Sequence, residues 1–295
     1  MKIVFHRIDH DGQCSAAILY NLFIADKPQL IGLDYNDNFS ECFNIDELDP
    51  NEQTYMVDFS LPPEDMIKLW NKLGDNLIWI DHHLSAIRNS ERHEYIEIKG
   101  VRNSGYAACE LTWKFVHGNN PPYPIFLLGK YDIWEHHLDP KILPFHYGLR
   151  TQKTKPDAII WRTIVNYSST SPQNAQFVDK IIVDGEAIIK YENNLNAGVL
   201  KSLLIPIKFN NFKIGCLNRS HISSKVFDLL ENKSEFDGFM TFSINREKMC
   251  KCTIYSNSPN LDSSQIAESF GGGGHFGAAG FTIPYTQLSK ILELS

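Results

Sequence analysis

Seven consecutive residues constrain the fold of this chain more than any other feature. The apolar run at residues 77–80 has the length and composition of a buried strand. It stops abruptly at an acid and two imidazoles, Asp81, His82 and His83. Open α/β sheets build their sites just past the carboxyl ends of strands. This stretch therefore predicts an α/β sheet with a functional site at that edge.

Two other apolar runs end in the same way. Residues 2–5 lead into an acidic turn, and residues 54–57 lead directly into Asp58. The acidic turn contains His6, Asp9 and Asp11. Residues 15–23 then have a helical pattern, and strand, turn and helix in this order open an α/β unit. Three strands are thus predicted to end in acids or histidines.

The remaining patterns predict two α/β domains. We expect a larger N-terminal domain with a mainly parallel sheet flanked by helices, a smaller C-terminal domain, and a site in the cleft between them. The expected boundaries are a catalytic domain at 1–172, a helical linker at 173–203 and a substrate-binding domain at 204–295. Further helices are predicted at residues 104–116, 125–131, 157–165, 173–200, 223–230 and 263–270, and C-terminal strands at 205–209, 212–217, 238–244 and 251–255.

Composition is that of an ordinary globular protein. The 295 residues are 43% hydrophobic, no 18 apolar residues run together, and the N-terminus lacks a signal-peptide pattern. We therefore expect a cytoplasmic protein without a membrane partner. The six cysteines form no CxxC pair and are expected to be reduced, with Cys250 and Cys252 on one buried strand face.

Eight polar residues make a carboxylate-rich cluster with several imidazoles: His6, Asp9, Asp11, Asp58, Asp81, His82, His83 and Asp132. Oxygen and nitrogen ligands without cysteine suit Mn²⁺ or Mg²⁺. Carboxylates gathered in one place repel one another unless cations neutralise them. Two metal ions would resolve the conflict and activate a water for attack on a phosphate. Alone, each residue could equally be a turn acid, a helix cap or a surface imidazole.

A glycine run, residues 271–274, precedes His275 and a pair of alanines. Without a following Gly-Lys-Ser/Thr it is not a nucleotide P-loop. The run is either a flexible turn or a backbone that approaches an anion closely.

Five motifs in this order resemble the DHH phosphoesterase superfamily, in its two-domain form with the DHH-associated C-terminal domain. They are Asp9-His10-Asp11-Gly12, Val57-Asp58, Asp81-His82-His83, Gly129-Lys130-Tyr131-Asp132, and Gly272-Gly273-Gly274-His275 followed by Ala278-Ala279-Gly280-Phe281. The resemblance spans nearly the whole chain.

The resemblance implies a role for each matching residue. It implies that His6, Asp9, Asp11, Asp58, His82 and Asp132 hold two Mn²⁺ ions, with Mg²⁺ as the alternative. Asp58 would bridge the metals, and Asp81 would orient His82. His83 would act on the substrate phosphate, which makes Asp81 and His83 the catalytic pair. Substrate would also contact Gly272, Gly273, Gly274 and His275.

Two positions depart from the family pattern. His6 precedes Asp9 by three residues, where many members have four. Tyr255 stands where the C-terminal domain often has an arginine. Tyr255 is therefore predicted to contact substrate, and Arg246 or Arg219 to supply the missing charge.

The leading functional prediction is a Mn²⁺-dependent phosphodiesterase that hydrolyses short oligonucleotides or small nucleotides. The alternatives are a hydrolase of cyclic dinucleotides or 3′-phosphoadenosine 5′-phosphate, a pyrophosphatase, and a nucleotide-sequestering protein without turnover. Residues 201–255 carry nine Lys/Arg against five Asp/Glu in a chain of net charge −7, which favours short substrates over long nucleic acid. A homodimer is left open.

Overall fold

The computed structural model describes residues 1–35, 37–95, 97–220, 222, 224–274 and 276–292. The chain divides into two compact units, Met1–Ile189 (unit 1) and Lys190–Ser295 (unit 2). Each unit is an α/β structure, as predicted, and the division falls inside one long helix, α9 (Pro172–Leu203). Among the described residues, no helix combines the length and the apolarity needed to cross a bilayer.

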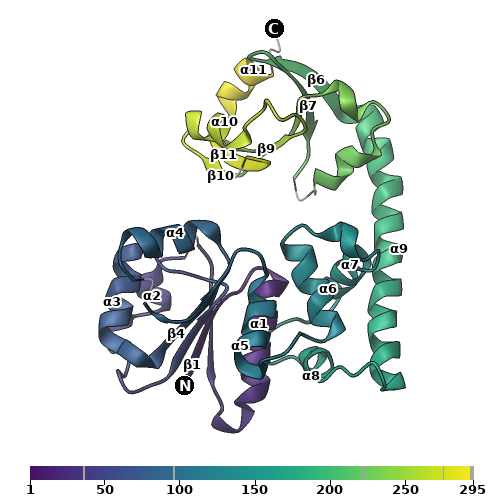
Figure 1. The fold of residues 1–295 in the computed structure, drawn as a ribbon. Coiled ribbons are helices and arrows are strands. Elements are labelled where there is room, and N and C mark those ends of the chain that lie inside the picture. The colour runs from purple at the N-terminus through teal and green to yellow at the C-terminus, as the bar shows by residue number, and fades with distance from the viewer. Residues whose placement is uncertain (36, 96, 221, 223, 275, 293–295) are drawn as a thin grey trace. The chain divides into compact units, whose positions relative to one another are not determined.

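Unit 1 is built on a five-stranded parallel sheet with the order β2-β1-β3-β4-β5. The strands are β1 (Lys2–His6), β2 (Gln29–Leu33), β3 (Thr54–Val57), β4 (Leu77–Asp81) and β5 (Lys99–Arg102). Helices cover both faces, α1 and α5 on one side and α3 and α4 on the other (Figure 1). Trp79 is therefore buried against α3, whereas its neighbour Ile80 packs on the opposite face with Leu19 and Leu111. This double burial explains the unbroken apolar run before Asp81.

The helices of unit 1 include several that the sequence patterns did not predict. The α-helices are α1 (His10–Leu22), α2 (Phe39–Cys42), α3 (Pro63–Leu73), α4 (Leu84–Arg92), α5 (Ala108–His117), α6 (Tyr123–Asp132), α7 (Ile142–Leu149) and α8 (Ile159–Val165). Single 3₁₀ turns are η1 (Ile24–Asp26), η2 (Ile45–Glu47), η3 (Gly74–Asn76) and η4 (His136–Leu138). The helix expected from residue 104 begins at Ala108, and the one expected from residue 15 begins at His10. Asp11 consequently lies in the first helical turn and not in a loop.

Unit 2 contains a mixed sheet with the strand order β10-β11-β9-β8-β7-β6. Its strands are β6 (Leu204–Phe209), β7 (Phe212–Asn218), β8 (Gly238–Ile244), β9 (Met249–Ser256), β10 (Gly273–Gly274) and β11 (Ala278–Pro284). Its helices are α10 (Ser263–Ser269) and α11 (Leu288–Ile291), with 3₁₀ segments η5 (Ser224–Leu229), η6 (Lys233–Glu235) and η7 (Tyr285–Gln287). The helix predicted at 223–230 is thus a 3₁₀ segment. Cys250 and Cys252 are both fully buried, as expected, with their sulfur atoms 3.8 Å apart.

Candidate metal centre

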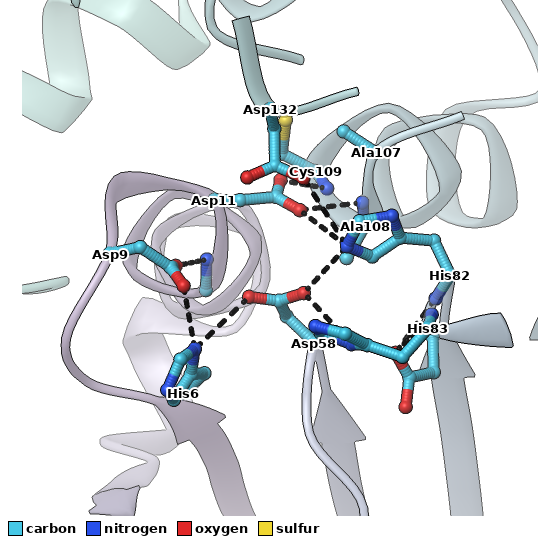
Figure 2. A network of polar contacts seen from close by, with 12 residues as sticks. His6, Asp9, Asp11, Asp58, His82, His83, Ala107, Ala108, Cys109 and Asp132 are labelled. Carbon is cyan, nitrogen blue, oxygen red and sulfur yellow. Dashed lines mark hydrogen bonds and ion pairs between the residues drawn. The ribbon is translucent and has the colours of Figure 1, made fainter. Parts of the chain in front are cut away.

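The predicted cluster of acids and imidazoles comes together at the carboxyl edge of the parallel sheet in unit 1 (Figure 2). His6 ends β1, Asp58 follows β3, and Asp81 ends β4. These three strands are parallel neighbours, so their carboxyl ends lie side by side. Helices carry the remaining three carboxylates: Asp9 is the N-cap of α1, Asp11 lies in the first turn of α1, and Asp132 ends α6.

Gly12 explains how α1 can begin so close to β1. A Cβ atom at this position would lie 2.2 Å from the carbonyl oxygen of His6, a separation that no side chain tolerates. Asp9 is the N-cap of the same helix and accepts a hydrogen bond from the Gly12 N–H at 2.9 Å. The Asp-x-Asp-Gly sequence is therefore a local structural unit that sets two carboxylates beside His6.

Asp58 lies at the centre of the site. Its φ of 54° is left-handed, a conformation that aspartate tolerates better than most residues, and its N–H donates to the carbonyl of Ile80 at 2.9 Å. The side chain is 1% exposed, and neither carboxylate oxygen has a hydrogen-bond partner among the described residues. His82 Nε2 lies 3.2 Å from its Oδ1, without the geometry of a hydrogen bond.

Potential ligand atoms form three groups, within each of which all atoms lie within 4.8 Å of one another. The groups are His6, Asp9 and Asp58; Asp58, His82 and His83; and Asp11, His82 and Asp132. Asp58 and His82 each belong to two groups, so they connect the whole set. His82 Nε2 is 3.3 Å from Asp132 Oδ2 and 3.6 Å from Asp11 Oδ2. All seven side chains belong to unit 1.

The electrostatics of the cluster fit a bound cation. Burial and the charges of Asp11, Asp9 and Asp132 raise the pKa of Asp58 well above its usual value. The same causes, burial first and then Asp11 and Asp9, raise the pKa of Asp132. Fully buried carboxylate oxygens without hydrogen-bond donors are stabilised by coordination to a cation, and oxygen with imidazole nitrogen is the ligand set of Mn²⁺ or Mg²⁺.

Asp9 differs from the other carboxylates because it has an imidazole partner. Its Oδ2 lies 2.6 Å from His6 Nδ1. Burial raises the pKa of Asp9, but the hydrogen bond and the charge of His6 outweigh burial, so the net pKa is lowered. His6 in turn packs against the rings of Tyr35 and Phe59, at 5.4 and 6.0 Å between centroids.

The N-terminus of α5 holds the carboxylate of Asp11. The backbone N–H groups of Ala108 and Cys109 donate to its Oδ2 and Oδ1, at 2.8 and 2.7 Å. These N–H groups have no partner within the helix, and the helix dipole favours a negative charge there. The sequence patterns did not reveal this contact, since the predicted helix began four residues earlier. In the sequence, only the small residues Ala107 and Ala108 indicated that another segment could approach this helix end closely.

An ion pair joins α5 to α6 behind the carboxylates. Lys130 Nζ lies 3.3 Å from Glu110 Oε2 and 3.0 Å from Glu135 Oε2, and Lys130 and Glu110 are buried. A Cβ at Gly129 would lie 2.6 Å from Cγ of Glu110, so glycine permits this contact. The pair positions Asp132, on α6, relative to the N–H donors of Asp11, on α5.

Asp81 contacts a different imidazole from the one we predicted. Its Oδ1 lies 2.8 Å from His83 Nδ1 and accepts the backbone N–H groups of His82 and His83 at 2.7 and 3.1 Å. The ring that Asp81 orients is therefore that of His83, because the chain turns back over the end of β4. Burial lowers the pKa of His83, but the hydrogen bond to Asp81 and the surrounding carboxylates raise it to about 9.

The glycine run of unit 2 forms part of a strand pair. Gly274 has a φ of 148°, and a Cβ there would lie 2.6 Å from Cα of Ala279 on β11. Gly272 approaches the carbonyl of Gly280 in the same way. Gly273 and Gly274 are exposed, whereas the predicted contact residue His275 lies outside the described residues.

The two remaining substrate candidates are Tyr255, which is separated from the glycine run by β11, and Arg246. Tyr255 pairs with Ala278 and packs against Phe227 at 6.2 Å between ring centroids. Arg246 is exposed in the turn before β9, and about 3.3 Å per strand residue puts roughly 20 Å between the two ends of that strand. Arg246 therefore lies at the other end of β9 from Tyr255, and its contact with substrate stays a prediction.

Two imidazoles next to the cluster, His10 and His146, were not among the residues that the sequence patterns predicted to be functional. His10, between Asp9 and Asp11, lies 5.2 Å from the ring of His146, which stacks on Tyr131 at 3.4 Å between centroids. Both ring nitrogens of His146 and Nδ1 of His10 are buried without a hydrogen-bond partner among the described residues. No sequence signal connected these residues, because His146 is 136 positions away and lies on α7.

Curated and solved proteins resemble this chain at low identity. An uncharacterized protein of Acanthamoeba polyphaga mimivirus is 26% identical over 296 residues, covering 94% of this chain and 66% of that protein. The chain thus spans just under two thirds of the length of its viral relative. The pGpG-specific phosphodiesterase PggH from Vibrio cholerae has a TM-score of 0.49 at 11% identity, covering 99% of this chain and 96% of that one.

RecJ in complex with Mn²⁺ from Thermus thermophilus also has a TM-score of 0.49, at 14% identity, covering 98% of this chain and 50% of that one. The family model of the DHH family, N-terminal domain, matches residues 1–147, the segment that contains every acid and imidazole of the cluster. Residues 1–147 of this chain are therefore a DHH family N-terminal domain.

Proposed function

We propose that this protein is a metal-dependent phosphodiesterase acting on short oligonucleotides or small nucleotides. One observation supports this more than any other. Asp58 is buried, neither of its carboxylate oxygens has a hydrogen bond from any residue that the structure describes, and imidazoles and further carboxylates converge on it. An arrangement of this kind is unfavourable without cations and is suited to holding them.

Six residues would hold two Mn²⁺ ions, or Mg²⁺ ions in their place: His6, Asp9, Asp11, Asp58, His82 and Asp132. Two such ions supply a water whose pKa is lowered from about 15.7 towards 7 and neutralise charge on a phosphate. Asp58 belongs to two of the three ligand groups and would contact both ions. The N–H donors of α5 fix the orientation of the carboxylate of Asp11.

His83 would contact the substrate phosphate. Asp81 Oδ1 lies 2.8 Å from Nδ1 of this ring, so Nε2 is the ring atom that could contact a phosphate oxygen. The ring is also 35% exposed, unlike the buried Asp81, and is therefore accessible to a ligand. Asp81 would act by holding this ring, as an acid commonly does for a functional histidine.

The remaining assignments concern the substrate and the domains. A catalytic domain at 1–172, a helical connection at 173–203 and a substrate-binding domain at 204–295 remain our proposal. In the last of these, Gly272 to Gly274 would present exposed backbone to the substrate, with His275 and Tyr255 as further candidates. Arg246, exposed before β9, remains a candidate for the positive charge that contacts substrate.

The test is product analysis with Mn²⁺ on a substrate panel. The panel contains 5′-phosphorylated RNA and DNA from dinucleotides to pentanucleotides, cyclic dinucleotides, 3′-phosphoadenosine 5′-phosphate and pyrophosphate. We expect turnover of at least one phosphodiester, abolished by His82→Ala and lowered about 10- to 100-fold by Asp81→Ala. Asp75→Asn, which changes an exposed acid paired with Lys99, is the matched control and should leave turnover unchanged.

Each other result has a clear meaning. Release of phosphate from pyrophosphate alone would replace the proposal with a pyrophosphatase. Nucleotide binding without any product would replace it with a sequestering protein.

A further inference from the structure

An exposed tryptophan lies immediately beyond the proposed metal ligands. Trp134 is 66% exposed and follows Asp132 by two residues. Two residues span at most about 7 Å of chain, so the backbone of Trp134 adjoins the metal centre. Indole is the largest apolar side chain, and here it is accessible to a ligand beside a polar site.

The backbone at Trp134 holds the indole in a strained conformation. Its φ is 63°, in the left-handed region where a bulky residue is an outlier. Hydrogen bonds fix the turn on both sides: the N–H of Trp134 donates to the carbonyl of Tyr131 at 3.2 Å, and the N–H of Glu135 to that of Lys130 at 2.9 Å. These bonds belong to the left-handed end of α6, a position that more often holds glycine than a large side chain.

A continuous series of rings connects Trp134 to the metal centre. Trp134 lies 5.7 Å from His136, His136 lies 5.1 Å from Tyr131, and Tyr131 lies 3.4 Å from His146, all between ring centroids. His146 is 5.2 Å from His10, which stands between Asp9 and Asp11 in the sequence. We call these five residues the aromatic strip: His10, His146, Tyr131, His136 and Trp134.

The chemistry of the strip suits a flat partner. Its five rings offer π faces. A nucleobase has the matching properties, since it is planar and stacks on aromatic side chains whatever its sequence identity. An acidic or aliphatic ligand would gain little from such a surface.

We propose that Trp134 is a stacking platform for a nucleobase of the substrate whose phosphodiester lies at the metal centre. This inference rests on the proposed function and narrows the substrate class to phosphodiesters that carry a base next to the scissile linkage. Trp134 binds the base and does not take part in the chemistry.

The kinetic test compares two dinucleotides of one length with Mn²⁺: 5′-phosphorylated ApA and its analogue in which both bases are removed. Loss of one stacking contact changes binding by about 10- to 100-fold. We therefore expect Trp134→Ala to raise KM for ApA by that factor with kcat nearly unchanged, and to leave the abasic analogue unaffected. Trp134→Phe should recover most of the loss, because it restores a ring.

A control variant removes an exposed aromatic residue elsewhere in unit 1. Phe115, on α5, is 39% exposed and lies seven residues beyond Ala108, or roughly 10 Å along the helix. Phe115→Ala should leave both substrates unaffected. Equal losses on ApA and on the abasic analogue in Trp134→Ala, or no loss at all, would overturn the proposal.

A second measurement does not need turnover and separates failure of this inference from failure of the proposed function. Tryptophan emission is followed during titration with adenosine 5′-monophosphate and, separately, with ribose 5-phosphate. We expect quenching by the base-bearing ligand alone, and its loss in Trp134→Phe. Unchanged quenching in that variant, or none in the wild type, excludes the stacking role even if the enzyme proves active. If no panel substrate is hydrolysed but this quenching is seen, the platform stands and the hydrolase proposal falls.

Discussion

At the scale of single residues, the metal centre depends on a carboxylate placed where water cannot reach it. Burial and four neighbouring carboxylates disfavour the negative charge of Asp58. The four are Asp11, Asp9, Asp132 and Asp81. A raised folded-state pKa means that ionised Asp58 destabilises the metal-free protein above the pKa of the unfolded chain. The same charge becomes favourable once a cation is bound. Stability without metal and affinity for metal therefore oppose each other at this residue.

We predict that Asp58→Asn stabilises the metal-free protein and weakens its response to metal. One unit of pKa shift corresponds to about 1.4 kcal/mol, and we expect the free energy of unfolding in EDTA to rise by at least about that amount at pH 7. Thermal unfolding with and without Mn²⁺ measures both effects. Asp46→Asn, an exposed carboxylate paired with Lys68, is the control. A variant that loses stability in EDTA but keeps the full Mn²⁺ shift would contradict this account.

His146 predicts a pH dependence of the opposite sign. Burial, followed by the nearby His10 and Arg150, lowers the pKa of His146 to about 2, against about 6.5 in the unfolded chain. Below pH 6.5 the unfolded state binds a proton that the folded state does not. Stability therefore falls with falling pH, by up to about 1.4 kcal/mol per pH unit from this group.

We expect His146→Gln to flatten the pH dependence of stability between pH 6.5 and 4.5. Urea unfolding in EDTA at several pH values gives the slope for each protein, and the carboxylates contribute equally to both. His137→Gln, at an exposed position, provides the control. Parallel slopes for His146→Gln and the wild type would show that the ring titrates normally in the folded state.

At the scale of elements, α7 and α9 pack through glycines. A Cβ at Gly185 would lie 1.7 Å from the carbonyl oxygen of Pro144, and one at Gly148 would lie 1.9 Å from that of Ile181. The backbones of the two helices therefore touch, and this contact seats α7, which carries His146. Gly198, on the same long helix, has no atom within 4 Å of its would-be Cβ.

These glycines make a matched pair of substitutions. Gly185→Ala should destabilise the protein by about 1 to 3 kcal/mol, because the added methyl group forces the helices apart. Gly198→Ala should stabilise it by up to about 1 kcal/mol, because alanine is the better helix former and meets nothing. Denaturant unfolding of both variants tests the packing, and a loss of stability in Gly198→Ala or none in Gly185→Ala would show that the helices do not meet as described.

Element prediction succeeded where burial and local preference agreed. The three strands that precede the acids and the long helix were predicted correctly, since both faces of the sheet are covered and the helix has few breaks. β5, with the sequence Lys-Gly-Val-Arg, has too little apolar pattern to be recognised. α7 contains proline and glycine, and it forms because the surrounding core outweighs its low helix propensity.

At the scale of the whole molecule, every residue of the metal centre belongs to unit 1. We predict that a fragment of residues 1–189 folds and shows the same metal-dependent stabilisation as the full chain, measured by thermal shift with Mn²⁺. Such a fragment should lose hydrolysis of the nucleotide panel, because the proposed substrate-binding glycines lie in unit 2. Full activity of the fragment would remove the substrate role of unit 2, and loss of the Mn²⁺ shift would mean that unit 1 does not form the site alone.

The sequence by itself determined the α/β class, the strand ends that carry acids and histidines, and the type of metal they suit. Those features are local: a buried run, a polar stop and a following helix can be read within a few residues. The tertiary structure alone decided which groups share a contact. Asp81 meets His83 because the chain turns back after β4, and Asp11 meets α5 across about 100 positions. Contacts between distant segments depend on packing, which no local pattern encodes.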